Sequence, residues 1–548
     1  MPRLPSPLAV RDWRKVSQAY YIWVLDPNAT GGGFPVVGIS PDKRGFTMKD
    51  YVGGEPGGEA LACLSAVIGA KLVGLDPTRL HGINYVERAK AWYDPVLGIY
   101  RNNAAERSPI VHADIYGYWA AILGIELAAQ YPGDKELQHQ TVTAARAFLQ
   151  IAHGLGAPGH PNYDVLGWDF SKNAPGGRPE PMNRLGHAPS VAWVLMVGTQ
   201  LTGNPEMRRC ARATMQWYTA HPGRYEISHV MGPLTAARLN VLGGPQIDID
   251  RVLSAWFGDG PASTHTMFVT SGTRFGGLTA DGLDGTRWPN GEFYAFTMGT
   301  LQNASWLVPV ARYDPRYARA IARFALHNAN SARLLQGMGL DADHQDHAEW
   351  KTQWDKDNLL FYEGLMSSAP NSHRFSPADP EPPRPLRPYA TGDPVLNAWG
   401  TGHPKVDPKD YLAQRAQWFG GTPDDLGLYG GNHVGFLGGI EKATEVPGIL
   451  RWDCLATDWY HPPALPTFLL YNPYRRTKVV TLPLDRSVSL YDAVTGHFLA
   501  RSVSHAYRLT LSPDQAAVIV EVPSKAKLTR HGHCLLASGI IIDYHSCP

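Results

Sequence analysis

Long apolar segments with helical spacing recur in pairs between residues 57 and 335, and short turns rich in Pro, Gly, Asn or Asp join the members of a pair. Segments 112–131 and 134–156 flank one such turn, and segments 187–203 and 205–221 flank another. Turns of this composition end a helix and reverse the chain, so paired helices pack antiparallel. The pattern predicts roughly ten to twelve helices. Because no residue pattern recurs at a fixed period and the loops are long and unequal, a closed helical barrel is favoured over a solenoid.

The pattern changes toward both ends of the chain. Residues 1–54 have no sustained helical period and are expected to form an extended lead-in with one or two short strands. Residues 55–366 are assigned to the barrel, and residues 367–447, rich in Pro and Gly, to a belt that closes on it. From Gly448, short alternating runs predict a small antiparallel β-sandwich over 448–523, followed by a tail over 524–548. The expected fold class is mainly α.

Composition excludes some classes of partner. The chain contains 50 Lys and Arg residues and 49 Asp and Glu residues, with no long basic run. This argues against nucleic acid as a partner. The five cysteines are widely spaced, and Cys534 and Cys547 are the one pair considered for a disulfide. No apolar run suits a membrane span or a signal peptide, so we expect no membrane partner and a protein that is cytoplasmic or exported with its signal removed. No cofactor is indicated, and the oligomeric state stays open.

The segment 341–363, DADHQDHAEWKTQWDKDNLLFYE, is the densest concentration of carboxylates, histidines and tryptophans in the chain. If it is helical from about Gln345, the candidate catalytic residues Asp346 and Glu349 share one face. Trp350 then offers a flat ring for a sugar, and His344 a hydrogen bond to its hydroxyls. An exposed acidic helix whose tryptophans dock on a neighbour is the alternative. A further alternative is a divalent metal held by His344 and His347 with Asp343 and Asp346.

Carboxylates with aromatic neighbours also occur at other junctions between loops and helices. Glycoside hydrolysis needs one carboxylic acid to protonate the leaving oxygen and a second carboxylate to activate water or attack the sugar. Each of these carboxylates has an ordinary alternative as a helix cap or as part of a packed loop. The candidates are Asp114 and Glu292 for catalysis, and Tyr116, Trp168, Asp169 and Trp288 for substrate contact.

A glycine-rich run, GLYGGNHVGFLGG, covers residues 427–439. Its spacing matches neither GxGxxG nor a phosphate-binding P-loop. It is expected to be a loop that presses Asn432 and His433 against the barrel mouth, which makes His433 a candidate for substrate contact. Purely structural glycines are the alternative.

Taken with the paired helices, the terminal β segments YNPY, VSLYDAVTG and AAVIVEVP resemble the six-hairpin glycosidase superfamily. The resemblance covers about residues 55–523 and is one of architecture, without a matched family motif. It implies an (α/α)6 toroid with a site at its wide end, lined by loops between hairpins, and an acid and a base on different hairpins. The pair expected on this basis is Asp346 or Glu349 with Asp114 or Glu292.

The function expected is therefore a glycoside hydrolase that cleaves an oligo- or polysaccharide. A polysaccharide lyase is the second hypothesis, in which Arg274 and Arg287 would neutralise a uronate carboxylate. The third is a carbohydrate-binding protein without catalytic activity.

Overall fold

The computed structural model describes most of the 548 residues. Short loops and much of the region between residues 366 and 427 fall outside the description. The described residues are 1–40, 45–48, 59–103, 107–176, 187–223, 228–257, 268–272, 274–275, 278–287, 293–345, 348–366, 389–391, 427–532 and 534–544.

Six helices form a closed inner ring. Along this ring α2, α4, α6, α8, α10 and α16 each contact the next, and α16 contacts α2. Helices α2 and α4 are buried along nearly their whole length and lack a polar face, as expected of helices surrounded by others. The bounds are α2 Ala60–Leu72, α4 Tyr118–Gln130, α6 His187–Thr202, α8 Gly232–Val241, α10 Thr297–Leu307 and α16 Val434–Ile440.

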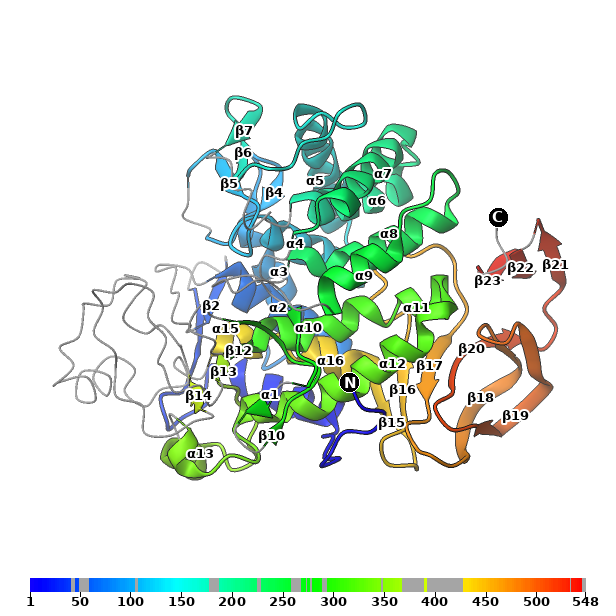
Figure 1. The fold of residues 1–548 in the computed structure, drawn as a ribbon. Coiled ribbons are helices and arrows are strands. Elements are labelled where there is room, and N and C mark those ends of the chain that lie inside the picture. Colours follow the sequence, from blue (N-terminus) through cyan, green and yellow to red (C-terminus); the bar gives the residue numbers. More distant parts are fainter. Residues whose placement is uncertain are drawn as a thin grey trace.

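A second layer of helices covers the ring (Figure 1). Helix α1 lies against α2 and α16, α5 against α4 and α6, α7 against α6 and α8, α9 against α8, and α12 against α10. These outer helices bury one face and expose a polar one, which is the pattern of a surface helix. The arrangement is compatible with the predicted helical toroid. The bounds are α1 Trp13–Val24, α3 Tyr85–Ala89, α5 Lys135–Gly154, α7 Pro205–Ala220, α9 Ile249–Phe257, α11 Val310–Tyr313 and α12 Ala318–Ser331.

Two predictions about segments outside the barrel were wrong. The lead-in is not extended throughout, because residues 13–24 form α1, capped by Asp12. The glycine-rich run is not a loop, because residues 428–431 form α15 and residues 434–440 form α16, which closes the ring. Glycine is a poor helix former, but here it allows close helix packing: a side chain on Gly435 would overlap the backbone of Gly69 on α2. Residues 367–388 and 392–426 of the predicted belt lie outside the described residues.

The inner helices α2, α4, α10 and α16 run parallel to one another. Near the start of α16, Asn432 donates to the carbonyl oxygen of Ala62 in the first turn of α2, and near its end Gly439 lies against Leu72. At the ends of α4 and α2, Gln130 donates to the Ile68 carbonyl. At the start of α10, Thr297 lies beside Gly430. The first turns of α2, α4, α10 and α16 therefore meet at one end of the ring, which we call the mouth.

The C-terminal part is a six-stranded antiparallel sheet in the order β15-β16-β17-β20-β18-β19. One face, with Leu469 and Val518, joins the core of the helical part, and β17 and β20 contact α12. The other face, with Leu470 and Ile519, packs in a second core with residues of β18 and β19. A register shift after Leu484 interrupts the β18–β19 pairing, as β-bulges do in bent hairpins. The bounds are β15 Glu441–Ala443, β16 Leu450–Asp453, β17 Thr467–Tyr471, β18 Lys478–Asp492, β19 His497–Leu511 and β20 Ala516–Pro523.

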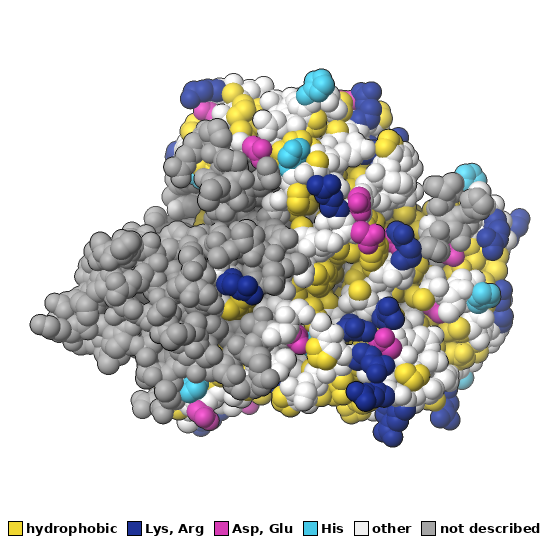
Figure 2. Space-filling view, in the orientation of Figure 1, with side chains coloured by type: hydrophobic (Ala, Val, Ile, Leu, Met, Phe, Trp, Pro, Cys, Tyr) yellow, Lys and Arg dark blue, Asp and Glu magenta, His cyan; other side chains and the backbone are white. Residues whose placement is uncertain are grey.

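Charged side chains reinforce this contact between the sheet and the helices. Figure 2 shows Lys and Arg side chains gathered on the side of the molecule where α12 and the sheet meet. Arg323 of α12 pairs at 2.6 Å with Asp514, in the turn between β19 and β20.

The remaining strands form small antiparallel sheets. The tail contributes three strands, β21 Leu528–His531, β22 Cys534–Ala537 and β23 Ile540–Asp543. Cys534 is disulfide-bonded, whereas Cys63, Cys210 and Cys454 keep their thiols; Cys547, the predicted partner of Cys534, lies outside the described residues. Among the helices described, none has the length and apolar character needed to cross a membrane. Other bounds are β1 Val37–Ile39, β2 Phe46–Met48, β3 Tyr93–Asp94, β4 Ile99–Tyr100, β5 Ile110–His112, β6 Gly167–Asp169, β7 Ala174–Gly176, β8 Phe268–Val269, β9 Arg274–Phe275, β10 Leu278–Thr279, β11 Asp284–Arg287, β12 Phe293–Phe296, β13 Gly364–Met366 and β14 Tyr389–Thr391.

Replacing Gly435 by Ala is expected to destabilise the protein by about 1–3 kcal/mol, because the added methyl group overlaps the Gly69 backbone and pushes α16 away from α2. Thermal unfolding would measure the loss. Gly133→Ala is the matched control, since a methyl group there meets no atom within 4 Å. Equal melting temperatures for the two variants would contradict close packing of α2 on α16.

Candidate active site

Three carboxyl side chains lie at the mouth of the ring. Glu59 immediately precedes α2, and Asp114 lies in the turn that leads into α4. Glu363 lies beside the first turn of α10, where its carbonyl oxygen accepts from the Thr297 amide at 2.9 Å. Each carboxyl thus belongs to a different sector of the ring, which is the arrangement needed to flank a bound molecule from more than one side.

The turn that carries Asp114 is held by local hydrogen bonds. Asp114 Oδ1 accepts from the Tyr116 amide at 3.0 Å, and the Asp114 carbonyl accepts from the Gly117 amide at 3.3 Å. Gly117 is required for the close approach, because a side chain there would overlap the carbonyl of His112. The turn therefore holds the Asp114 carboxyl in one position between β5 and α4.

Asp114 lines a pocket of about 170 Å³. Burial raises the pKa of its carboxyl above the ordinary range, and the charge of His112, whose Nδ1 lies 3.8 Å from Oδ2, opposes the rise together with the Tyr116 and Gly117 amides. Tyr116 is partly exposed and offers a ring beside the carboxyl. The pocket is lined by Arg101, Asn102, Ser108, Ile110, Val111, His112, Asp114, Tyr116 and Gly117.

Glu59 lies behind one wall of this pocket. Its Oε1 accepts from the Asn102 side-chain amide at 3.0 Å, whereas its buried Oε2 has no hydrogen-bond partner in the described structure. Burial raises the pKa of Glu59 to about 7, and the Asn102 hydrogen bond opposes the rise. Asn102 itself is fixed, because its side-chain oxygen accepts from the Leu61 amide at 3.1 Å. Glu59 is thus a carboxylic acid that keeps its proton to near neutral pH.

The third carboxyl, that of Glu363, is buried and hydrogen-bonded to a tyrosine. The Tyr429 hydroxyl on α15 (Leu428–Gly431) donates to Glu363 Oε1 at 2.6 Å. The two groups come from segments far apart in the sequence and meet between the starts of α10 and α16. This pair braces the mouth on the side of the ring away from α4.

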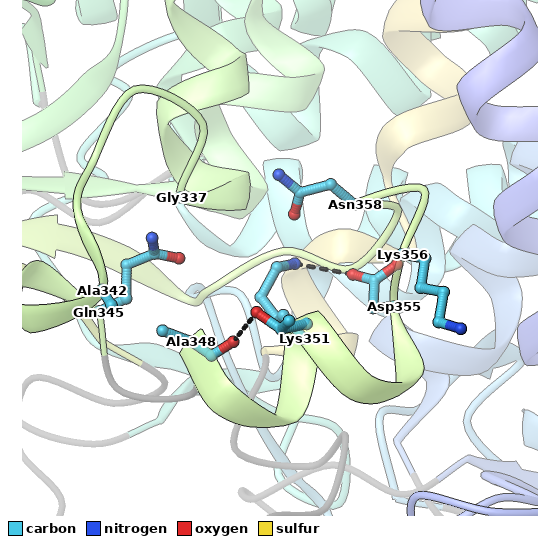
Figure 3. A pocket seen from close by; sticks show the side chains of 9 residues that line it. Gly337, Ala342, Gln345, Ala348, Lys351, Asp355, Lys356 and Asn358 are labelled. Carbon is cyan, nitrogen blue, oxygen red and sulfur yellow. Dashed lines mark hydrogen bonds and ion pairs between the residues drawn. The ribbon is translucent and has the colours of Figure 1, made fainter.

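The acidic segment lines a second, more open pocket of about 440 Å³ (Figure 3). Lys351, on α13 (Ala348–Trp354), points at Asp355, with Nζ 2.8 Å from Oδ2 and 2.6 Å from the Leu360 carbonyl. Burial lowers the pKa of Lys351, and Asp355 opposes the shift. Asp355 also accepts from the amides of Leu359 and Leu360 at 2.7 and 2.9 Å. The carboxylate of Asp355 therefore holds α13 against the loop that follows it.

The site residues predicted in the acidic segment lie in different surroundings, and some of them are not described. Asp346 and the side chain of Glu349 lie outside the described residues. Trp350 is partly buried, and its indole N–H donates to the Gly32 carbonyl at 3.2 Å, so the ring docks on the N-terminal loop. His344 ends a short 3-10 turn and is half-buried. The docking of Trp350 favours the alternative in which tryptophans of this segment anchor it to a neighbour.

Trp168 and Asp169 on β6 are both buried. Trp168 is fully buried against Gly154 at the end of α5, so the prediction that its ring stacks on a sugar finds no exposed face. Asp169 Oδ1 accepts from the Ser171 hydroxyl at 2.6 Å and from the amides of Ser171 and Lys172. These hydrogen bonds lower the pKa of Asp169 to about 2. Asp169 is therefore an ionised cap of the turn between β6 and β7.

His433 is buried beneath the mouth rather than exposed at it. Its Nδ1 lies 2.5 Å from Gln302 Nε2 on α10, and its Nε2 has no hydrogen-bond partner in the described structure. Burial lowers the pKa of His433 to about 3, so the ring is neutral. Trp288 and Glu292 lie outside the described residues.

Sequence reasoning placed Asp114 and Tyr116 together, and the structure brings both to one pocket. It missed Glu59, Asn102 and the bond between Glu363 and Tyr429. A usable signal for Glu59 was its position directly before an almost entirely apolar helix, whose N-terminus favours a carboxylate. The other contacts join distant segments and leave no local pattern.

No family model matches this chain, and neither does any curated protein. Among solved structures, the chain is similar to a GH127 β-L-arabinofuranosidase from Geobacillus stearothermophilus T6, at 13% sequence identity and a TM-score of 0.36. The similarity covers 97% of this chain and 85% of that enzyme's chain. At this level the likeness does not assign a family, so the candidate site is judged on its own geometry.

Proposed function

We propose that the protein is a glycoside hydrolase whose active site is the pocket at the mouth of the helical ring. The observation that carries the proposal is the pair of carboxyls there: Asp114 lines the pocket, and Glu59 lies behind Asn102 with a pKa of about 7. Hydrolysis of a glycosidic bond needs one protonated and one ionised carboxyl. Glu59 supplies the protonated one at neutral pH.

In this proposal Asp114 acts on the anomeric carbon, either directly or through water, and Glu59 supplies the proton for the leaving oxygen through one water molecule, because Asn102 stands between its carboxyl and the pocket. Tyr116 gives the sugar an aromatic face, and Asn102 holds Glu59 and offers its amide to hydroxyl groups. The substrate class is an oligo- or polysaccharide.

A lyase is the second candidate, because Arg101, His112 and Tyr116 share the pocket. A lyase needs a free positive charge to neutralise the uronate carboxylate. Arg101 already pairs with Asp94 at 3.2 Å and donates to the Ser108 carbonyl at 2.7 Å, so its charge is largely committed. This favours hydrolysis.

A product assay separates the candidates. The purified chain is incubated with a panel of neutral and uronate-containing glycans, and new reducing ends and the ultraviolet absorbance of unsaturated uronates are followed in parallel. Reducing ends without that absorbance support hydrolysis. Both signals together indicate a lyase, and binding without either signal indicates a carbohydrate-binding protein.

The pH dependence of activity tests the role of Glu59. Because the acid must be protonated and its pKa is about 7, kcat/KM is expected to fall as pH rises through about 7. Glu59→Gln should abolish this alkaline limb and lower turnover, most strongly for substrates with poor leaving groups. Glu87→Gln, at an exposed position on α3, is the control and should keep the wild-type profile. An unchanged limb in Glu59→Gln would move the acid role to another group.

A further inference from the structure

A cluster of metal-ligating side chains lies on the outer layer of helices, away from the mouth pocket. His153 is in the last turn of α5, and Glu206 and Cys210 are one helical turn apart on α7. One ligand atom from each lies within 4.8 Å of the other two. Helices α5 and α7 contact each other, so the cluster spans two separate helices.

The local structure positions these side chains. Asn204 caps α7 by accepting from the Glu206 amide at 2.9 Å, which holds Glu206 in the first turn facing α5. His153 Nε2 lies 3.1 Å from Glu206 Oε1, and Cys210 Sγ lies 3.6 Å from the same oxygen. In tetrahedral zinc coordination, bonds of about 2.0–2.3 Å place neighbouring ligand atoms about 3.3–3.7 Å apart. The two distances to Glu206 are close to that spacing, and the ligand atoms of His153 and Cys210 lie within 4.8 Å of each other.

The three donors select a class of metal. One imidazole nitrogen, one carboxylate oxygen and one thiolate sulfur suit Zn²⁺ or another late first-row ion, whereas Ca²⁺ and Mg²⁺ prefer oxygen ligands alone. Cys210 is a free thiol and buried, while the side chain of His153 is 47% exposed. The exposed side leaves room for a water molecule as the fourth ligand.

Charges around the cluster act in both directions. Arg209 pairs with Oε2 of Glu206 and so leaves Oε1 to face His153 and Cys210. The guanidinium and the N-terminus of α7 disfavour a cation, whereas the C-terminus of α5 favours one. Burial and then Glu206 raise the pKa of Cys210 to about 12, with Arg209 opposing, so metal binding must displace the thiol proton.

We propose that His153, Glu206 and Cys210 form a zinc site that ties α5 to α7. The site is independent of the proposed hydrolase activity and is structural. Without a metal, the same residues would be only a surface ion-pair cluster over a buried thiol, and the experiment below distinguishes the two.

The test uses the full chain freed of metal with a chelator and titrated with Co²⁺, which reports its ligands by absorbance. One equivalent is expected to bind and to give a thiolate-to-cobalt charge-transfer band, and Zn²⁺ should then displace the cobalt and remove the band. Zn²⁺ alone should raise the melting temperature of the metal-free protein, since ligands that bind only the folded state stabilise it.

Cys210→Ser should lose the charge-transfer band, and His153→Gln should weaken cobalt binding at least about tenfold, in line with the loss of a metal contact. His139→Gln is the matched control, an exposed histidine on the same helix, and should bind like the wild type. Circular dichroism confirms folding of each variant. Absence of the band in the wild type, or its persistence in Cys210→Ser, would overturn the zinc site.

Discussion

Asp114→Asn is expected to lower kcat by roughly 10²- to 10⁴-fold, the range that general acid-base groups contribute. The melting temperature should hardly change, because Asn keeps the side-chain oxygen that accepts from the Tyr116 amide. A neutral side chain also suits a site where burial already raises the pKa of the carboxyl. Steady-state kinetics and thermal unfolding of the same preparation would measure both quantities.

The matched control for this change is Asp485→Asn, at an exposed position on β18 far along the chain from the mouth. It should leave both kcat and stability at wild-type values. Full turnover by a folded Asp114→Asn variant would remove the mouth pocket from the catalytic proposal and return attention to the acidic segment.

Asp458→Ala is expected to destabilise the protein by about 3–5 kcal/mol, because it leaves buried guanidinium groups without their counter-charge. Asp458 is fully buried; its Oδ2 lies 2.9 Å from Arg312 and accepts from the Tyr313 hydroxyl at 2.6 Å. Arg238 on α8 lies 3.5 Å from Oδ1. The cluster joins two helices of the ring assembly to the segment between β16 and β17.

Denaturant unfolding would measure this loss, with Asp485→Ala as a surface control expected to change stability by less than about 0.5 kcal/mol. Arg312 also donates to the hydroxyl of Tyr544, just beyond β23, so the tail should become more sensitive to proteolysis in Asp458→Ala. If Asp458→Ala unfolds at the same denaturant concentration as the wild type, the two arginines must find other partners.

The local signals in the sequence were sufficient for the long paired helices and for the strands after Gly448. Apolar runs bounded by turn residues located α4, α5, α6 and α7, and Asp134, the first residue of the segment 134–156, caps α5. The change to alternating residues after Gly448 located β16 to β20. These elements depend on spacing and capping, which act over a few residues and can be read from one chain.

Ring closure was not predictable in this way. Helix α16 contains three glycines in seven residues, and its propensity argues for a loop. It is helical because Gly435 and Gly438 let it lie against the backbones of α2 and α1, and this gain in packing outweighs propensity. Helix α1 did carry a helical spacing of buried residues, but it lies in a segment whose Pro and Gly content obscured the pattern.

The candidate site likewise has a part that the local sequence predicts and a part that it does not. The sequence by itself determined that Asp114 and Tyr116 lie together at a helix start, because they are two residues apart in one capped turn. Only the tertiary structure brought Glu59 to Asn102 across 43 residues, and Tyr429 to Glu363 across 66. Their burial, and with it the pKa of about 7 at Glu59, depends on the helices that surround them. Desolvation is a property of the packed assembly, so no local pattern in the chain encodes it.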